Sequence, residues 1–273
     1  MRKYAVAVCF LALLPVLRGQ MGSPARAIRI HNLKLEGVSE VPKTDLAAID
    51  EELKRECCGH AETQEMRKQI VYAFQERGYV KVRIDRMEVI PMDTHTAPPA
   101  VNISADISPG QRFRLKSIQF RGNEAIPSNP LRQQFLISDG ELFNVEKIRQ
   151  GLNNLRQIYA TQGYINYAPV PNTEADERSG TVTLTIDSDE GVQFRLGGLL
   201  LDGEEPHEGD GAKLLSAWKP MEGKAYDARK IEEWWQLAAT MLPPGSKLEQ
   251  SLGLMQDPKA NTVTGVLNFA AAN

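Results

Sequence analysis

Acidic side chains gather in one stretch of the chain, and they are the first candidates for chemistry. Between residues 202 and 210 one histidine, His207, accompanies several carboxylates: Asp202, Glu204, Glu205, Glu208 and Asp210. Carboxylate oxygens at such density are the ligands that calcium prefers. Their spacing matches no calcium-binding loop, so we interpret the stretch as a solvated acidic turn. The alternative is a metal-binding protein with its site in this loop.

The other histidines and the cysteines form no catalytic or metal-binding pattern. The four histidines are scattered along the chain, as is typical of surface residues: His31, His60, His95 and His207. Cys57 and Cys58 are adjacent, whereas zinc sites have ligand pairs of C-x₂₋₄-C spacing. An oxidising compartment could join them in a strained disulfide, or they are two thiols at a helix end.

The sequence contains no phosphate-binding loop, nucleophile elbow or zinc-protease motif. We therefore predict a protein that is not an enzyme and has no catalytic residue, no cofactor, no bound metal and no small-molecule substrate. A hydrolase with its site between two domains remains the alternative.

The first residues have the features of a secretory signal peptide. Arg2 and Lys3 precede an apolar run over residues 4–17, and Ala25-Arg26-Ala27 provides an A-x-A cleavage site. Cys9 lies inside the apolar run, which argues against lipid attachment. We predict a signal peptide over residues 1–27; the alternative is an uncleaved anchor.

The charge of the chain argues against two kinds of partner. The formal net charge is −3. The charged residues within residues 1–27 are all basic, so removal of this segment makes the net charge more negative. Because nucleic-acid affinity depends on basic contacts to phosphates, we predict no nucleic-acid binding. The same balance argues against attraction to anionic lipid.

One strand pattern recurs three times and organises the chain. Residues 113–122 alternate as a half-buried strand, with a slip at Lys116–Ser117 that requires a bulge. The apolar residues and the closing glycine of the three copies have the same spacing: Ile28, Ile30, Leu33, Leu35 and Gly37; Phe113, Leu115, Ile118, Phe120 and Gly122; Phe194, Leu196, Leu199, Leu201 and Gly203. We interpret Gly37, Gly122 and Gly203 as structural turn residues with positive φ.

Helices and further strands follow each copy. In the first unit we expect helices over residues 44–56 and 63–77 and strands over 79–90 and 100–107. In the second we expect helices over 129–136 and after Asn144, and strands over 164–170 and 181–186. The third is more divergent, with strands over 247–255 and 262–269. Its helical stripe includes Trp234, a predicted core residue, whereas Trp235 could be core or an exposed contact.

The predicted fold class is α+β, with three tandem two-layer β-α-α-β-β domains after the signal peptide. The domains cover residues 28–110, 111–191 and 192–273. Short linkers between them predict a rod with limited bending.

Residues 113–190 resemble a POTRA (polypeptide-transport-associated) domain. The resemblance rests on F-R-L-K-S-I-Q-F-R-G-N, G-E-L-F-N, Y-A-T-Q-G-Y and D-E-G-V-Q-F, and the other two units share the strand phase and glycine spacing. It implies a scaffold in the periplasm, either free or associated with the outer membrane, that binds unfolded client polypeptides, outer-membrane proteins or subunits of their assembly machinery. Such proteins carry a C-terminal barrel, which we expect to be absent; a fragment of a barrel-bearing assembly protein is the alternative.

The resemblance also implies binding by pairing at an exposed sheet edge. The strand after the long helix is the candidate edge in each unit: residues 79–90, 164–170 and 247–255. The middle one supplies the candidate peptide-binding residues Tyr164, Ile165, Asn166, Tyr167, Ala168, Pro169 and Val170. Alternatively, charged residues block these edges: Lys81, Arg83 and Lys247.

Overall fold

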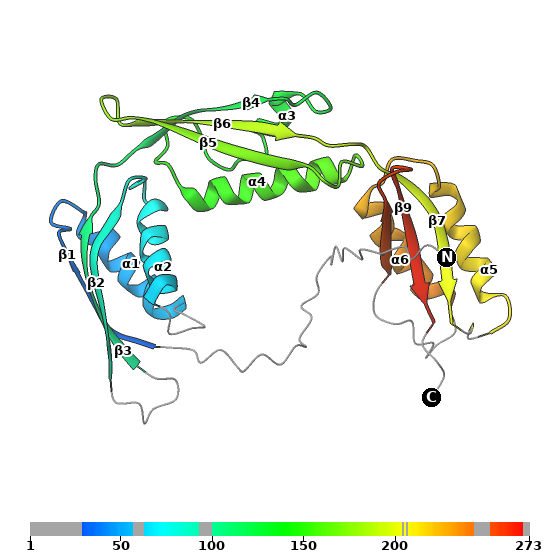
Figure 1. Cartoon of the computed structure of the whole chain (residues 1–273), viewed down its shortest axis with the longest axis horizontal. Helices are drawn as coiled ribbons and strands as arrows, with labels where there is room; N and C mark the ends of the chain where they lie inside the picture. The colour runs from blue at the N-terminus through cyan, green and yellow to red at the C-terminus, as the bar shows by residue number, and fades with distance from the viewer. Residues whose placement is uncertain are drawn as a thin grey trace, which may run out of the picture.

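Three small sheets, each packed against helices, make up the described part of the chain (Figure 1). The computed structural model describes residues 29–56, 63–92, 100–203, 205, 207–242 and 252–269. This architecture confirms the predicted α+β class with three tandem two-layer units. The predicted signal peptide lies outside the described residues, as do Cys57, Cys58, His60, His95 and Glu204.

Domain 1 consists of a sheet with two helices. Its elements are β1 (Arg29–Glu36), α1 (Lys43–Glu56), α2 (Thr63–Gln75), β2 (Arg83–Pro91) and β3 (Ala100–Ser108). The strand order is β1-β3-β2, in which the central β3 is parallel to β1 and antiparallel to β2.

Domain 2 repeats this topology. Its elements are β4 (Arg114–Arg121), α3 (Ser128–Arg132), α4 (Val145–Ala160), β5 (Ala168–Asp176) and β6 (Thr181–Asp189), in the order β4-β6-β5. Figure 1 shows domain 2 between the other two domains, with α4 along one face of its sheet.

Domain 3 has the same strand order, β7-β9-β8. Its elements are β7 (Arg195–Asp202), α5 (Asp210–Trp218), a short 3₁₀ helix η1 (Lys219–Met221), α6 (Ala228–Met241), β8 (Gly253–Asp257) and β9 (Thr262–Asn268). The sequence pattern did not reveal α5, because its buried stripe includes a glycine and an aspartate beside Leu214 and Trp218.

The repeated strand is irregular where the sequence predicted it. The register between β4 and β6 shifts between Leu115 and Ser117, which confirms the predicted bulge. Corresponding shifts occur between Ile30 and Asn32 and between Leu196 and Leu199. A bulge adds one residue to a strand, so apolar residues on both sides of it can face the core.

Each repeated strand ends at a glycine that lies against the central strand. The φ angles of Gly37, Gly122 and Gly203 are 76°, 70° and 89°. A Cβ atom at Gly203 would lie 2.6 Å from the carbonyl oxygen of Phe269, and one at Gly37 would collide with that of Ile107. Only glycine satisfies both the positive φ and this close backbone approach.

The third core contains a tryptophan pair. Trp234, predicted to be core, packs edge-to-face on the buried Trp218 with ring centroids 4.8 Å apart. Trp235 is half-buried against the same core, so it is neither a full core residue nor an isolated exposed one.

Two of the predicted strands begin later than the alternation suggested. Residues 164–167 form a turn, not a strand, and β5 begins at Ala168. The reason is the helix end, where Gly163 takes a φ of 90° and the Tyr164 N–H bonds back to the Tyr159 carbonyl oxygen. The Tyr167 ring then stacks on the Tyr159 ring at 3.7 Å, so it belongs to the core. In domain 1, likewise, β2 begins at Arg83.

Candidate functional site: open sheet edges and domain joints

The candidate binding edges are strands with one partner only. Among the described residues β2, β5 and β8 each pair with the central strand of their sheet and with no other strand. Their outer sides can therefore offer N–H and C=O groups to an added strand. Which groups point outward determines what each edge can bind.

The register of β5 determines which of its backbone groups point to the open edge. Backbone groups in an antiparallel pair point alternately toward the partner strand and away from it. The Ser188 carbonyl oxygen faces β4, since a Cβ atom at Gly122 would lie 2.8 Å from it. Pro169 is paired with Ser188, so its backbone groups point away from β6, to the open edge. The backbone groups of every second residue after it also point to the open edge, namely those of Pro171, Thr173 and Ala175.

The two prolines therefore remove the N–H donors from the first half of this edge. Proline cannot donate to a ladder, and in sheets its nitrogen faces the open side of an edge strand. Four of the predicted peptide-binding residues precede the strand: Tyr164, Ile165, Asn166 and Tyr167. The backbone groups of Ala168 and Val170 point toward β6. Only the Pro169 carbonyl is directed outward. The complete donor–acceptor positions of β5 are Thr173 and Ala175.

The edge of domain 1 offers more complete positions. The Met92 N–H donates to the Ala100 carbonyl oxygen at 2.9 Å, so Ala100 faces β2. Pro91 is paired with Val101, the residue after Ala100, so its backbone carbonyl points to the open edge. The backbone groups of Val89 and Met87, two and four residues earlier, point the same way. Val89 and Met87 keep both donor and acceptor on the open side.

The charged side chains that were expected to block these edges do not all lie along them. Lys81 lies before β2 and pairs with Glu177 of domain 2, while its ammonium lies 6.0 Å from the Phe113 ring centroid. Arg83 is exposed at the start of β2, and Lys247 lies outside the described residues. Lys81 is thus engaged at the joint between domains instead of at the open edge.

The opposite edge is partly covered by the chain itself. The Leu115 N–H donates to the Glu141 carbonyl oxygen at 2.8 Å, and Leu196 donates to Lys224 at the same distance in domain 3. These bonds place the loop before the long helix along the start of β4 and β7. In domains 2 and 3, β5 and β8 therefore have the more accessible edges.

Both joints between domains have the same backbone link. The Phe113 N–H donates to the Gly78 carbonyl oxygen at 2.9 Å, and the Phe194 N–H donates to that of Gly163 at 2.8 Å. Each glycine lies three residues after the end of a helix, α2 or α4, and each phenylalanine directly precedes the first strand of the next domain. The repeated strand spacing places Phe113 and Phe194 at equivalent positions, but it does not show that each meets a glycine of the preceding domain.

An asparagine reinforces the joint between domains 1 and 2. The Asn144 Oδ1 atom accepts from the Lys147 N–H at 2.8 Å and thereby caps α4. Its Nδ2 group donates to the Glu76 carbonyl oxygen at 2.8 Å, beyond the end of α2. One side chain thus connects a helix end of domain 1 with a helix start of domain 2.

The corresponding cap in domain 3 cannot make this connection. Asp227 caps α6 by accepting from the Arg229 N–H at 2.9 Å. A carboxylate has no hydrogen to donate to a carbonyl oxygen of the preceding domain. Gln193 provides a different link, because its Nε2 group donates to the Gln162 carbonyl oxygen at 2.9 Å.

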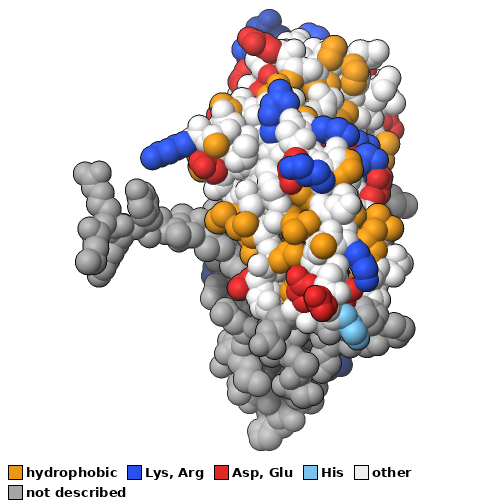
Figure 2. Space-filling model, turned by 90° about the vertical axis from the view of Figure 1, so that its right-hand side faces the viewer, with side chains coloured by type: hydrophobic (Ala, Val, Ile, Leu, Met, Phe, Trp, Pro, Cys, Tyr) orange, Lys and Arg blue, Asp and Glu red, His pale blue; other side chains and the backbone are white. Residues whose placement is uncertain are grey.

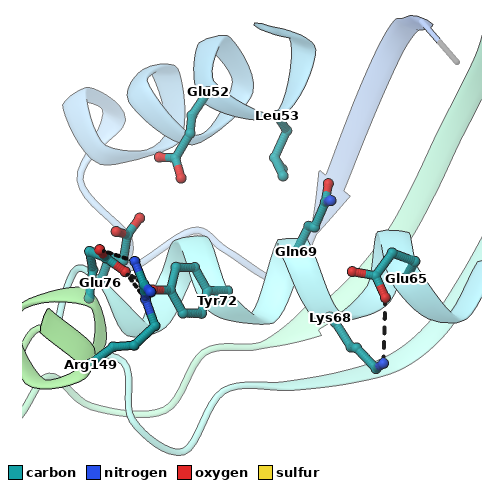
Figure 3. A pocket seen from close by; sticks show the side chains of 9 residues that line it. Glu52, Leu53, Glu65, Lys68, Gln69, Tyr72, Glu76 and Arg149 are labelled. Carbon is teal, nitrogen blue, oxygen red and sulfur yellow. Dashed lines mark hydrogen bonds and ion pairs between the residues drawn. The ribbon is translucent and has the colours of Figure 1, made fainter. Parts of the chain in front are cut away.

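A cavity of about 570 Å³ lies between the helices at the joint of domains 1 and 2 (Figure 3). Mostly charged side chains from α1, α2, the residue after α2, and α4 line it: Glu52, Leu53, Glu65, Lys68, Gln69, Tyr72, Glu76, Glu146 and Arg149. The Tyr72 hydroxyl donates to the Glu146 carboxylate across the joint, and Arg149 holds that carboxylate at 2.6 and 2.7 Å.

The carboxyl groups at this cavity have very different pKa values. Hydrogen bonds from Arg149 lower the pKa of Glu146 to about 2, so it is ionised at neutral pH. Burial, followed by the nearby Glu52 carboxyl, raises the pKa of Glu76 to about 7. Burial and the bond to Glu146 raise the pKa of Tyr72 to about 12, so its hydroxyl remains a donor.

The acidic loop of domain 3 is not fully solvated. Asp210 is only 1% exposed, accepts from the Lys213 ammonium at 2.9 Å and lies 3.7 Å from the His207 ring. The Lys213 bond lowers the pKa of Asp210. In the part of the chain that the structure covers, no group of three or more His, Cys, Asp and Glu residues is placed to hold a metal ion.

Domain 3 differs from domain 2 in the outer face of its sheet. The polar row Gln119, Thr185 and Asn172 of domain 2 corresponds in register to Leu200, Val266 and Gly253 of domain 3. Leu200 is 51% exposed. Figure 2 shows apolar side chains interspersed with charged ones at this end of the molecule. Among the described residues, no helix has the length and apolar character needed to cross a membrane.

Comparison with known proteins finds similarity to one family in the middle of the chain. Residues 113–191 match the family model described as POTRA, surface antigen variable number repeat. Outer membrane protein assembly factor BamA of Neisseria meningitidis is 25% identical over 159 residues, which cover 53% of this chain and 19% of that protein. A putative outer membrane protein assembly factor of Treponema pallidum is 26% identical over 60% of this chain and 18% of its own length. The chain thus spans about a fifth of these curated relatives.

A solved structure shows the same fold. The crystal structure of POTRA domains 3–5 of Haemophilus influenzae BamA matches with a TM-score of 0.58 and 17% identity, over 89% of this chain and 95% of that one. The match extends beyond the segment found by the family model to most of the chain. Residues 113–191 thus match the POTRA family model, and the chain shares the fold of three tandem POTRA domains.

Proposed function

We propose that this chain is a periplasmic, non-catalytic POTRA scaffold that binds extended polypeptide segments. Its partners would be unfolded outer-membrane clients or subunits of the machinery that assembles them. Relatives named as outer membrane protein assembly factors support the general role. The observation that carries the binding mode is the open outer side of β2, β5 and β8.

Pairing at these edges is suited to clients of varied sequence. Main-chain hydrogen bonds provide affinity without reading side chains, and an unfolded chain can present a strand of any composition. The complete positions Met87 and Val89 in β2, and Thr173 and Ala175 in β5, would hold the added strand. Pro169 and Pro171 would prevent pairing along the first half of β5.

Proline substitution at an outward position tests this mode. Thr173→Pro removes an N–H that no strand of domain 2 uses, whereas the matched control Thr173→Ala keeps it. Binding of a labelled, denatured outer-membrane barrel protein to the full chain would be measured by fluorescence anisotropy. We expect about fivefold weaker binding for Thr173→Pro than for Thr173→Ala, since one hydrogen bond contributes about 1 kcal/mol.

The same pair of substitutions at Val89 tests the edge of domain 1. Circular dichroism spectra should be the same for each proline variant and its alanine control. Equal affinity of proline and alanine variants at both sites would contradict edge pairing. A chain that binds no unfolded outer-membrane polypeptide and crosslinks to no envelope protein would contradict the scaffold itself.

A further inference from the structure

The joint between domains 1 and 2 brings three glutamates together from three helical segments. Glu52 lies on α1, Glu76 follows the end of α2, and Glu146 lies in the first turn of α4. They line one cavity, and Figure 3 shows Glu52 on α1 and Glu76 just beyond the end of α2, beside Arg149 of α4. Domain 2 also binds Glu76 through its backbone, where Asn144 donates to the carbonyl oxygen.

Basic groups already satisfy two of these carboxylates. Arg77 donates to Glu52 at 2.9 Å. Arg149 binds Glu146 in a two-pronged pair, and the Tyr72 hydroxyl and Gln150 also donate to it. Glu76 lines the same cavity as these two ion pairs, and after burial the Glu52 carboxyl is the main cause that raises its pKa. Two carboxyl groups can share a hydrogen bond only if one of them carries a proton.

We propose that the Glu76 carboxyl is a proton-dependent switch that controls how closely domains 1 and 2 pack at their joint. When it is protonated, Glu76 donates to Glu52, and the helices of domain 1 and α4 remain close together. When it ionises, Glu52, Glu76 and Glu146 form three adjacent negative charges that Arg77 and Arg149 offset in part. The repulsion separates α1 and α4, and the cavity widens.

The charges around Glu76 place this transition near neutral pH. Burial and the Glu52 carboxyl raise the Glu76 pKa to about 7, more strongly than Arg77 lowers it, and Glu146 adds to the increase. Arg149 keeps Glu146 ionised throughout this range. Tyr72 stays protonated, because its own pKa is about 12. Glu76 is thus the group at the joint whose charge changes between mildly acidic and mildly basic conditions.

The consequence for function depends on the arrangement of the edges. Domains 1 and 2 carry the open strands β2 and β5, and their joint sets how these strands are directed toward one bound polypeptide. A change in the joint would alter whether a single client can reach both edges. This consequence rests on the proposed binding function. The proton-dependent switch itself does not, and it can be tested without a client.

Double electron–electron resonance can measure the joint in the full chain. Spin labels would be attached at Ala47→Cys on α1 and Gln157→Cys on α4, which are exposed positions outside the cavity. The native cysteines would be changed to serine. We expect the distance distribution to shift to longer distances between about pH 6 and about pH 8, with a midpoint near 7.

Two glutamine variants isolate the group responsible. Glu76→Gln has nearly the same shape but no titratable proton, and it should show the acidic distribution at both pH values. Glu65→Gln makes the same charge change in the same cavity, but Glu65 pairs with Lys68 on its own helix. This control should keep the wild-type shift.

Direct titration provides a second readout. The ¹³C signal of the Glu76 carboxyl, assigned by comparison with Glu76→Gln, should titrate with a pKa near 7. A pKa near the ordinary glutamate value would overturn the proposal, as would a pH shift of distance that persists in Glu76→Gln. Either result would leave the edge-pairing function intact, because that function is tested by client binding.

Discussion

Asn144 provides the sharpest test of how the first joint is held. Its side chain makes two bonds of 2.8 Å, one to the α4 amide of Lys147 and one to the carbonyl of Glu76 in domain 1. Aspartate caps a helix about as well as asparagine but has no N–H to donate. Asn144→Asp should therefore weaken the joint and leave the start of α4 intact.

The expected magnitudes follow from the two bonds. A hydrogen bond contributes about 1 kcal/mol, so Asn144→Asp should cost the joint about that amount. Asn144→Ala also removes the cap and should cost about 2 kcal/mol in all. Since about 1.4 kcal/mol corresponds to tenfold in an equilibrium, loss of the joint bond should favour joint opening about fivefold.

Hydrogen exchange followed by NMR separates the two effects. The Phe113 amide bonds across the joint to Gly78, so its exchange should accelerate about fivefold in both variants. The Lys147 amide should exchange faster only in Asn144→Ala. The Phe194 amide, which makes the same bond at the second joint, is the internal control. Unchanged exchange at Phe113 in Asn144→Asp would refute the bridging role.

Two further predictions concern a glycine and a titrating carboxyl. Gly122→Ala should lower the stability of domain 2 by about 2–3 kcal/mol in thermal unfolding, because a Cβ atom would combine a φ of 70° with a 2.8 Å approach to the Ser188 oxygen. Gly140→Ala has a similar φ of 86° but meets nothing within 4 Å, so it should cost about 1 kcal/mol; equal losses would contradict the steric explanation. Glu76 should make stability fall as pH rises from 4.5 to 7, because the folded chain holds a proton that the unfolded chain has lost. Glu76→Gln should remove this fall, about 1 kcal/mol after allowance for solvent screening, and a melting temperature that depends on pH as in the wild type would count against the assignment.

The sequence by itself determined the repeated architecture. Alternation with one slip requires a bulged strand with an apolar face, and the pattern occurs three times with the same closing glycine. These features are local, because side-chain periodicity and positive φ are set by a residue and its immediate neighbours. The bulge at Leu115/Ser117 and the core position of Trp234 were predictable for the same reason.

The start of β5 depended on packing beyond the local pattern. Tyr164 and Tyr167 suit a strand by composition, but their rings pack against Tyr159 of α4 before the chain reaches the sheet. The position at which β6 offers a partner sets the first strand residue, Ala168. Propensity could not show this, because strand formation depends on tertiary neighbours.

Only the tertiary structure decided which backbone groups are open and which charges meet. Pro169 and Pro171 are visible in the sequence, but their effect on the edge follows from a register that other strands fix. Glu52, Glu76 and Glu146 belong to separate helical segments, and no spacing in the sequence relates them. The joint brings them together in one cavity, and this proximity, with partial loss of solvent, moves the Glu76 pKa to about 7.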